Sequence, residues 1–228
     1  MTVQLRKPKA ILFDLDGTLV DSAPDLAGAL QAMQQVRGLA LHTLDDLRAH
    51  ASSGARGMVW KGFGIGPGHD DFETLREEFL TRYEQRLAEQ TTLFVGFDRL
   101  LPWLKLNDIR WGVVTNKHER FAVPLMKALG LFEPCSVLIG GDTTPHPKPH
   151  PAPCLEAARR LQLDPADCWF AGDDERDIIA GREAGMVTVA TRYGYCGSAK
   201  PIEEWEADCV VDGVEDLQVA IEQALQDY

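Results

Sequence analysis

The chain has 228 residues and is acidic, with 23 Lys and Arg against 35 Asp and Glu, a net charge of −12 at pH 7 and a pI near 4.9. Its composition, 45% hydrophobic and 25% charged, is that of a globular protein and excludes wholesale disorder. The negative charge argues against nucleic acid or an anionic membrane as the main partner. A phosphorylated ligand would therefore need a local supply of cations.

Export and disulfide bonding are not expected from this sequence. No stretch approaches the roughly 18 apolar residues of a membrane span. The first apolar run, residues 10–13, stops at Asp14 and is shorter than the roughly 7–15 residues of a signal peptide. The five cysteines are never closer than 13 positions, so no CxxC pair exists. We therefore expect free thiols and a cytoplasmic protein.

The first 90 residues predict one buried strand followed by helices. The strand covers residues 9–14. Ser22-Ala-Pro-Asp25 has the spacing of a helix start with a capping box, and this helix runs to about Val36. A second helix is predicted over 71–89 from an apolar stripe at steps of three and four. The glycine-rich stretch between them, 53–68, is predicted to be a loop.

From about residue 109 the pattern becomes an alternation of strands and helices. The predicted strands are 109–115, 136–139, 168–171, 187–191 and 209–211, and the predicted helices are 119–129, 152–161, 177–184 and 214–225. This alternation is typical of a parallel sheet covered on both faces. We expect an α/β fold with a Rossmann-like parallel sheet.

The distance between the first two strands predicts an inserted domain. The first strand ends near residue 14 and the next begins near 109, whereas a plain βαβ unit needs only about 30 residues. We therefore expect an α/β core made of 1–21 and 94–228, and an inserted helical cap made of 22–93. Proline at every second position of 145–153 excludes a helix there, so His146 and His150 are not an i,i+4 zinc pair.

Polar residues follow four of the predicted core elements. They are Asp14-Leu-Asp16-Gly17-Thr18, Thr115-Asn116-Lys117, the loop residue Lys148, and Asp173-Asp174 with Asp177. Ligands of open parallel sheets bind outside the carboxyl ends of the strands. Crowded carboxylates repel unless a cation lies among them, and oxygen ligands without His or Cys favour Mg²⁺ over Zn²⁺. Such a metal would attract phosphate, and Lys148 and backbone N–H groups after Asp14 can hold the remaining phosphate oxygens.

This set of residues suits phosphoryl transfer. Hydrolysis of a phosphate monoester is among the slowest uncatalysed reactions, and a covalent intermediate divides it into two easier steps. A carboxylate beside a metal is a suitable nucleophile for phosphorus, and a second carboxyl two residues later projects to the same side. We therefore assign Asp14 as the nucleophile and Asp16 as the general acid and base.

The complete motif set resembles a known superfamily. Asp14-x-Asp16-Gly-Thr18, Thr115, Lys148 and Gly172-Asp-x-x-x-Asp177, in this order, are similar to the haloacid dehalogenase superfamily of phosphohydrolases. The resemblance covers essentially the whole chain, because the insert lies where that superfamily has its helical cap. Gly140-Gly-Asp142, Lys148-Pro-His-Pro151 and Thr115-Asn-Lys117 resemble the phosphoglycolate phosphatase group.

The resemblance implies a role for each matching position. Asp14 would become the aspartyl-phosphate and Thr115 would bind the phosphoryl group. Lys148 would steady the phosphoryl group and the nucleophile Asp14. Mg²⁺ would be held by Asp14, the backbone carbonyl of Asp16, Asp173 and Asp177, the last through metal-bound water. The implied substrate contacts are Gly17, Thr18, Asn116, Lys117 and Arg56, of which Arg56 and Lys117 are candidates to hold a substrate carboxylate.

Two positions leave the substrate open. Asp174 stands where the phosphoglycolate group usually has a small hydroxyl residue, and Arg176 stands where Asn is common. Residues 172–178, with Arg192-Tyr-Gly-Tyr195, resemble more closely a branch that dephosphorylates N-acetylmuramic acid 6-phosphate in cell-wall sugar recycling. Both substrates carry a phosphate and a carboxylate. We take 2-phosphoglycolate as the default and the sugar acid as the alternative.

Three other functions use similar residues. A phosphomutase would return the phosphoryl group to its sugar, and the sequence does not exclude it. A dehalogenase would not need Asp16, because no leaving oxygen requires a proton. A receiver-like signalling module would be about half this length and carry no insert. We predict a phosphoric monoester hydrolase for a small phosphorylated carboxylate or sugar acid, acting as a monomer or homodimer.

Overall fold

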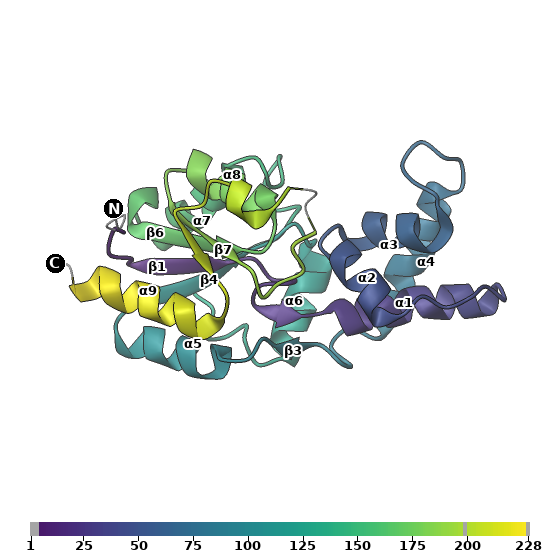
Figure 1. Cartoon of the computed structure of the whole chain (residues 1–228), viewed down its shortest axis with the longest axis horizontal. Helices are drawn as coiled ribbons and strands as arrows, with labels where there is room; N and C mark the ends of the chain where they lie inside the picture. Colours follow the sequence, from purple (N-terminus) through teal and green to yellow (C-terminus); the bar gives the residue numbers. More distant parts are fainter. Residues whose placement is uncertain (1–4, 198–199, 227–228) are drawn as a thin grey trace.

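The computed structural model describes residues 5–197 and 200–226, which form an α/β core with a helical region at one end (Figure 1). The core sheet has six parallel strands in the order β5-β4-β1-β6-β7-β8. The strands are β1 (Ala10–Phe13), β4 (Arg110–Val114), β5 (Leu138–Ile139), β6 (Cys168–Gly172), β7 (Val187–Thr191) and β8 (Cys209–Val211). The predicted parallel α/β sheet is confirmed.

Strand β1 is central and fully buried, and its alternating side chains build two separate cores. Ile11 and Phe13 join the cluster that contains side chains of α5, α6 and α9, whereas Ala10 and Leu12 join the cluster of α7 and α8. The helices are α5 (Phe97–Leu106), α6 (Glu119–Ala128), α7 (Ala152–Leu161), α8 (Glu175–Glu183) and α9 (Val214–Gln226). Full burial of a Leu, Ile or Phe side chain contributes about 1.5–3 kcal/mol, so the apolar run of β1 fixes both layers.

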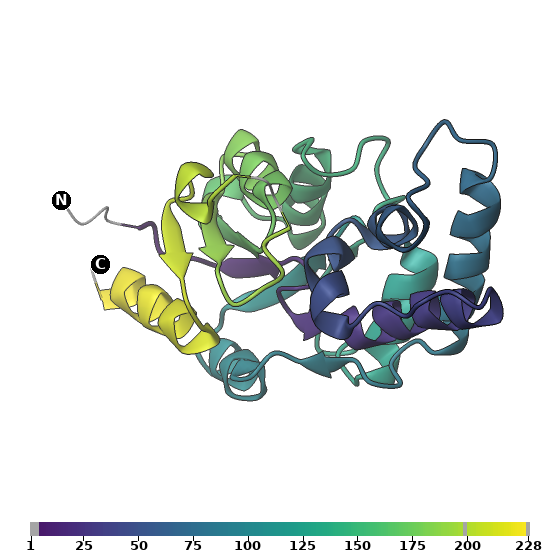
Figure 2. The same ribbon diagram turned by 45° about the vertical axis from the view of Figure 1, so that its right-hand side comes forward.

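The register of the three central strands brings their carboxyl ends to one level. Phe13 of β1 lies opposite Val113 of β4 on one side and Ala171 of β6 on the other. The residues that follow these strands therefore emerge at the same edge of the sheet. This is the edge that faces the helical region (Figure 2).

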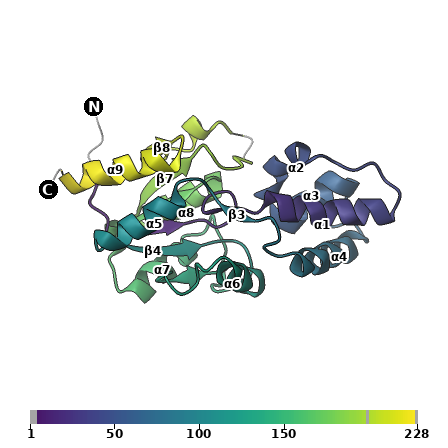
Figure 3. The same ribbon diagram turned by 90° about the horizontal axis from the view of Figure 1, so that it is seen from below.

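The helical region is an insert between β1 and β4. It contains α1 (Ala23–Val36), α2 (Leu44–Ala51), α3 (Gly54–Phe63) and α4 (Phe72–Gln85), which pack on one another around their own apolar cluster. Figures 2 and 3 show these helices as a unit beside the core. A short antiparallel ribbon of β2 (Val20–Asp21) and β3 (Thr92–Leu93) joins the chain entering the insert to the chain leaving it.

The prediction of a loop over 53–68 was wrong, because α3 occupies most of it. Met58 and Val59 are buried against the other helices of the insert. The glycines allow close packing: a Cβ at Gly57 would lie 2.5 Å from the backbone oxygen of His50, and one at Gly62 would lie 2.5 Å from a methyl group of Leu30. Tertiary contacts thus outweighed the low helix propensity of glycine.

The remaining predicted elements are present; those over 152–161, 187–191 and 209–211 have the predicted bounds, and others have shifted ends. The helix predicted over 71–89 ends at Gln85, and α8 begins at Glu175, two residues before the predicted start. Sequence analysis did not predict α2 or α5 as separate helices. All five cysteines are free thiols. Within the described ranges, no helix has the length and apolar character needed to cross a membrane.

Candidate active site

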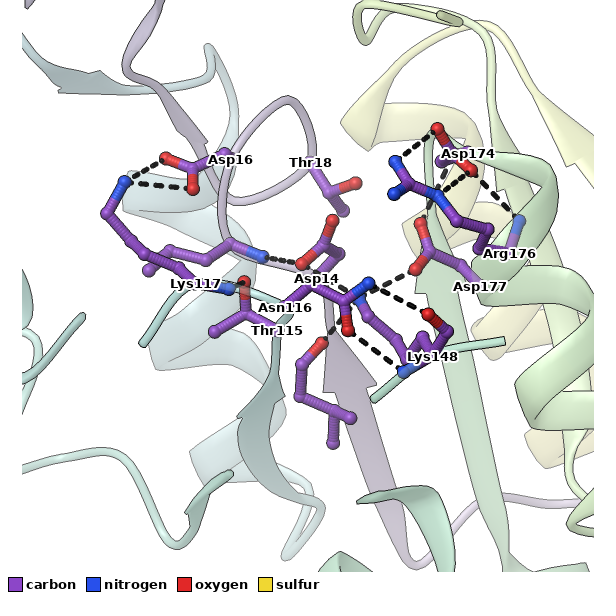
Figure 4. Close-up of polar contacts among 12 residues, drawn as sticks. Asp14, Asp16, Thr18, Thr115, Asn116, Lys117, Lys148, Asp174, Arg176 and Asp177 are labelled. Carbon is purple, nitrogen blue, oxygen red and sulfur yellow. Dashed lines mark hydrogen bonds and ion pairs between the residues drawn. The ribbon is translucent and has the colours of Figure 1, made fainter. Parts of the chain in front are cut away.

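Lys148 lies at the centre of the carboxyl edge of the sheet, between two aspartates (Figure 4). Its Nζ is 2.9 Å from an oxygen of Asp14 and 2.6 Å from one of Asp177, and it donates to the carbonyl of Val114 at 2.8 Å. The Lys148 side chain is only 2% exposed. Burial alone would lower the pKa of Lys148, but attraction to Asp14 and Asp177 outweighs it and raises the pKa. Lys148 is therefore a fixed positive charge beside Asp14.

Three aspartates at this edge form a group suited to a cation. Asp14, Asp173 and Asp177 each place a carboxylate oxygen within 4.8 Å of the others. Burial and repulsion from Asp14 raise the pKa of Asp173 well above its usual value. Burial also raises the pKa of Asp177 to about 7, although Lys148 opposes the shift. Crowded carboxylates with no His or Cys among them fit a hard divalent cation.

The turn after β1 is built around Gly17 and Thr18. Gly17 has a φ of +91°, and a Cβ there would lie 2.3 Å from an oxygen of Asp173, so only glycine fits without displacement. The Thr18 hydroxyl donates to Asp173 at 2.9 Å, and the Gly17 N–H donates to the carbonyl of Val20 at 2.9 Å. Both residues thus support the aspartate group in this structure.

Asp16 lies beside this group and is paired with Lys117. The Nζ of Lys117 is 3.0 Å from each carboxylate oxygen of Asp16 and 4.5 Å from the centre of the Tyr83 ring, which belongs to α4 of the insert. The hydroxyl of Ser22, at the start of α1, also donates to Asp16. Ser22 therefore makes no side-chain cap on α1, and the predicted capping box is absent.

Thr115 and Asn116 follow β4 and position the loop around Lys148. The Thr115 hydroxyl accepts from the backbone N–H of Lys117 at 3.2 Å. The amide of Asn116 bonds to the Lys148 backbone in both directions: its oxygen accepts from the Lys148 N–H and its nitrogen donates to the Lys148 carbonyl, each at 2.9 Å. The sequence predicts Asn116 as a substrate contact. In this structure its amide holds the backbone of Lys148.

Asp174 begins α8 and connects the core to the insert through Arg176. Its carboxylate accepts from the N–H of Arg176, as an N-cap, and Asp177 completes a capping box. The Arg176 guanidinium bonds to both oxygens of Asp174 and donates to the carbonyl of Ser52 in the insert at 2.8 Å. Burial would raise the pKa of Asp174, but the bonds from Arg176 lower it. The two residues that depart from the phosphoglycolate pattern are thus partners.

A cavity of about 250 Å³ lies between the core and the insert. Asp14, Asp16, Lys117 and Lys148 line it from the core, and Arg56 lines it from the start of α3. The wall on the other side is largely apolar, with aromatic and aliphatic side chains from α1, α4 and α6. These are Leu26, Phe79, Leu80, Tyr83 and Phe121. Of the predicted site residues, the structure brings all but Gly17, Thr18 and Asp173 to the cavity wall, and those three support it from behind.

Sequence reasoning assigned no role in the site to two residues that contact it, Tyr195 and Tyr83. Tyr195 donates from its N–H to Asp173 at 2.8 Å and from its hydroxyl to Asp21 at 3.0 Å, and that hydroxyl also accepts from the N–H of Ala23 at 2.9 Å. Tyr83 packs against Lys117. Tyr195 lies in the segment that resembles the sugar-acid branch, but that resemblance assigned it no role, and Tyr83 belongs to no motif; their contacts in space place both at the site. The apolar stripe of α4 located Tyr83 on a buried face but gave no sign that this face meets the site.

Comparison with known proteins places these observations in a family. Residues 11–191 match the family model described as haloacid dehalogenase-like hydrolase. The chain is 46% identical over 217 residues to N-acetylmuramic acid 6-phosphate phosphatase of Pseudomonas putida, covering 95% of this chain and 97% of that one. It is also 46% identical over 212 residues to phosphoglycolate phosphatase of Xanthomonas campestris pv. campestris, covering 91% and 94%.

A solved structure agrees with this placement. The crystal structure of a predicted phosphoglycolate phosphatase from Haemophilus somnus superposes with a TM-score of 0.82 at 29% identity, covering 93% of this chain and 97% of that one. The match includes the parallel sheet and the helical insert. The Asp14–Lys148 pair, the aspartate group and these similarities agree with the resemblance read from the motifs. The chain belongs to the haloacid dehalogenase-like hydrolases and is a phosphoric monoester hydrolase of that family.

Proposed function

We propose that the chain is a Mg²⁺-dependent phosphatase that hydrolyses a phosphorylated sugar acid through an aspartyl-phosphate on Asp14. The observation that carries the proposal is the position of the Asp14 carboxylate. It lines the cavity, lies 2.9 Å from Lys148 Nζ, and has carboxylate oxygens of Asp173 and Asp177 within 4.8 Å. A nucleophile for phosphorus needs an open side toward the substrate and positive charge beside it.

The proposed reaction has two steps. Asp14 attacks phosphorus, the bond to the leaving oxygen breaks, and Asp16 gives that oxygen a proton. In the second step Asp16 takes a proton from water, which attacks phosphorus and releases inorganic phosphate and Asp14. Lys148 and the hydroxyl of Thr115 offset the charge on the phosphoryl oxygens in both steps. Proton transfer by a positioned group contributes about 10²–10⁴-fold to the rate.

The aspartate group would hold the metal. Asp14, Asp173, Asp177 and the backbone carbonyl of Asp16 would provide oxygen ligands, which is the donor set that favours Mg²⁺. The bound ion would supply positive charge to the phosphoryl oxygens. Lys148 would keep Asp14 and Asp177 in place as carboxylates.

The cavity supports N-acetylmuramic acid 6-phosphate as the leading substrate. A volume of about 250 Å³ and an apolar wall that includes Phe79, Tyr83 and Phe121 suit a sugar ring with its substituents. A relative that bears the name of this phosphatase is 46% identical over nearly the whole chain.

The second candidate is 2-phosphoglycolate, the default from the sequence. A relative named phosphoglycolate phosphatase shows the same 46% identity, so the comparisons are balanced. This substrate is short and has no ring, so it would leave the apolar wall of the cavity unfilled. The geometry therefore favours the sugar acid.

We further propose that residues 22–93 act as a cap that opens and closes over the site. The β2–β3 ribbon lies at both ends of this segment, where the chain leaves and re-enters the core. The Arg176–Ser52 bond and the Lys117–Tyr83 contact join the two parts on the cavity side. Closure of a cap excludes water during the first step.

The test is release of phosphate with Mg²⁺ from N-acetylmuramic acid 6-phosphate and 2-phosphoglycolate, repeated in EDTA. We expect turnover of the sugar acid, none in EDTA, and none by Asp14→Asn; Asp98→Asn, an exposed first-turn acid of α5, is the matched control. Preference for 2-phosphoglycolate would establish the second candidate. Turnover by Asp14→Asn would refute the mechanism, and phosphoryl return to the sugar in the presence of a sugar bisphosphate would indicate a mutase.

A further inference from the structure

The cavity wall carries an excess of positive charge that the phosphoryl site does not use. Its four carboxylates, Asp14, Asp16, Asp174 and Asp177, each pair with a cation of the same wall: Lys148, Lys117 or Arg176. Three further arginines line the same cavity: Arg56, Arg76 and Arg120. In a chain with a net charge of −12, this local excess indicates a second anionic group on the ligand.

Arg76 and Arg120 lie on opposite sides of the boundary between insert and core. Arg76 belongs to α4 and Arg120 to the first turn of α6, and these helices lie side by side (Figure 3). The Tyr83 and Phe121 rings make contact between them, with centroids 5.8 Å apart. Arg120 is also 4.0 Å from Glu77 of α4. An anion between the two guanidinium groups would therefore touch both parts of the protein.

The acidic neighbours of these arginines hold them weakly. Among the described residues, the ion-pair partner of Arg76 is Glu73, at 3.3 Å and 76% exposed, and Glu77 near Arg120 is 62% exposed. Exposed ion pairs of this kind contribute little free energy to the folded state. Neither glutamate lines the cavity, whereas both arginines do. The guanidinium groups can thus exchange these partners for a ligand carboxylate, which they can bind through two parallel hydrogen bonds.

The helix geometry sets the distance between the two anionic ends of the ligand. Tyr83 packs on Lys117 at the Asp16 end of the cavity, and Arg76 precedes Tyr83 by seven residues on α4. At 1.5 Å per residue, this places Arg76 about 10 Å farther along the helix. The carboxylate of 2-phosphoglycolate is too close to its phosphorus to span this distance, whereas a carboxylate on the far side of a sugar ring is not.

From these observations we infer that Arg76 and Arg120 form a carboxylate subsite that selects phosphorylated sugar acids over phosphorylated sugars without the acid group. The inference rests on the proposed function and adds the residues that determine specificity. The subsite differs from the predicted carboxylate contacts, of which Lys117 is bonded to Asp16. Binding between α4 and α6 also draws the insert toward the core, so the acid group of the correct substrate favours closure.

A pair of substrates that differ only in the acid group tests this. N-acetylmuramic acid 6-phosphate and N-acetylglucosamine 6-phosphate share the ring, the acetamido group and the phosphate, and only the first has the lactyl ether with its carboxylate. We expect Arg76→Gln and Arg120→Gln each to raise the KM of the acid sugar roughly 10- to 100-fold. The kcat/KM for the sugar without the acid group should change by less than about threefold. Arg120→Lys should recover part of the loss.

The controls separate this inference from the proposed function. Arg99→Gln, an exposed arginine of α5 that pairs with Glu215 and does not line the cavity, should leave the KM and kcat for both sugar phosphates unchanged. Equal loss on both sugar phosphates, or no loss on the acid sugar, would refute the subsite while leaving the phosphatase intact. A wild-type enzyme that hydrolyses 2-phosphoglycolate but neither sugar phosphate would refute the leading substrate and the subsite together. Thermal unfolding of each variant checks that its fold is retained.

Discussion

The ammonium group of Lys117 is 3.0 Å from both carboxylate oxygens of Asp16, although the two residues are 101 positions apart. Asp16 follows β1 and Lys117 follows β4, so the pairing of these strands brings the two together. The Lys117 side chain is 8% exposed and also packs on Tyr83 of the insert. Burial would lower the pKa of Lys117, but attraction to Asp16 outweighs it and raises the pKa. Lys117 is thus a charged residue that holds the proposed general acid.

Replacing Lys117 should affect the step that needs a proton. We expect Lys117→Met to lower kcat/KM for an alkyl phosphate roughly 10²-fold, because Asp16 loses its fixed orientation. The loss should be much smaller for p-nitrophenyl phosphate, whose leaving group needs no proton. Lys127→Met, an exposed residue of α6, is the control. Equal losses on the two esters would show that Lys117 does not act through Asp16.

Two glycines with positive φ allow a matched test of the turn after β1. A Cβ at Gly17 (φ +91°) would meet Asp173, whereas a Cβ at Gly38 (φ +65°) would extend into open space, with nothing within 4 Å beyond its chain neighbours. We expect Gly38→Ala to cost about 1 kcal/mol from backbone strain alone, and Gly17→Ala to cost more than about 2 kcal/mol because Asp173 must also move. Urea unfolding measures both free energies. Equal destabilisation would mean that the turn can relax away from Asp173.

The raised pKa of Asp177 predicts that the stability of the metal-free protein depends on pH. Its folded pKa, about 7, is above its ordinary value of 3.8, so the folded state binds a proton more tightly than the unfolded state. The resulting stabilisation is complete below about pH 4 and is lost as the pH rises through 7. In EDTA, the free energy of unfolding of wild type relative to Asp177→Asn should fall over this range.

Added Mg²⁺ should reverse this trend, because the ion binds the carboxylates that protons otherwise occupy. We expect Mg²⁺ to raise the melting temperature of wild type more at pH 8 than at pH 5, and to have little effect on Asp177→Asn at either pH. A rise that is independent of pH, or equal in the variant, would contradict a cation site at this aspartate.

Asn116 should behave as a positioning residue for Lys148. Asn116→Ala removes both bonds to the Lys148 backbone, so we expect kcat to fall roughly tenfold while the KM changes little. Asn107→Ala is the matched control, because Asn107 donates its amide to a backbone carbonyl at the exposed end of α5. A large rise in KM with unchanged kcat would instead support the substrate contact expected from the sequence.

The sequence alone predicted the sheet and the motif residues. The run of β1 is apolar on both faces and the later strands alternate with helices, so a covered parallel sheet follows from local pattern. The carboxyl ends of parallel strands share one edge, so the proximity of Asp14, Lys148 and Asp173 could be expected from the order of elements in the sequence. The long gap before the second strand indicated the insert.

The tertiary structure decided what the sequence pattern could not. Helix α3 forms in a glycine-rich stretch because its buried side chains pack on the rest of the insert, and that gain is not local. The Thr115-Asn-Lys117 motif does not indicate which residue the Lys117 ammonium group will contact. The register of β1 against β4 brings Asp16 to it. Arg76 and Arg120 belong to no motif and meet at one cavity because α4 packs against α6. Local propensity and strand order are properties of sequence, whereas the partner of each charge depends on how distant elements pack.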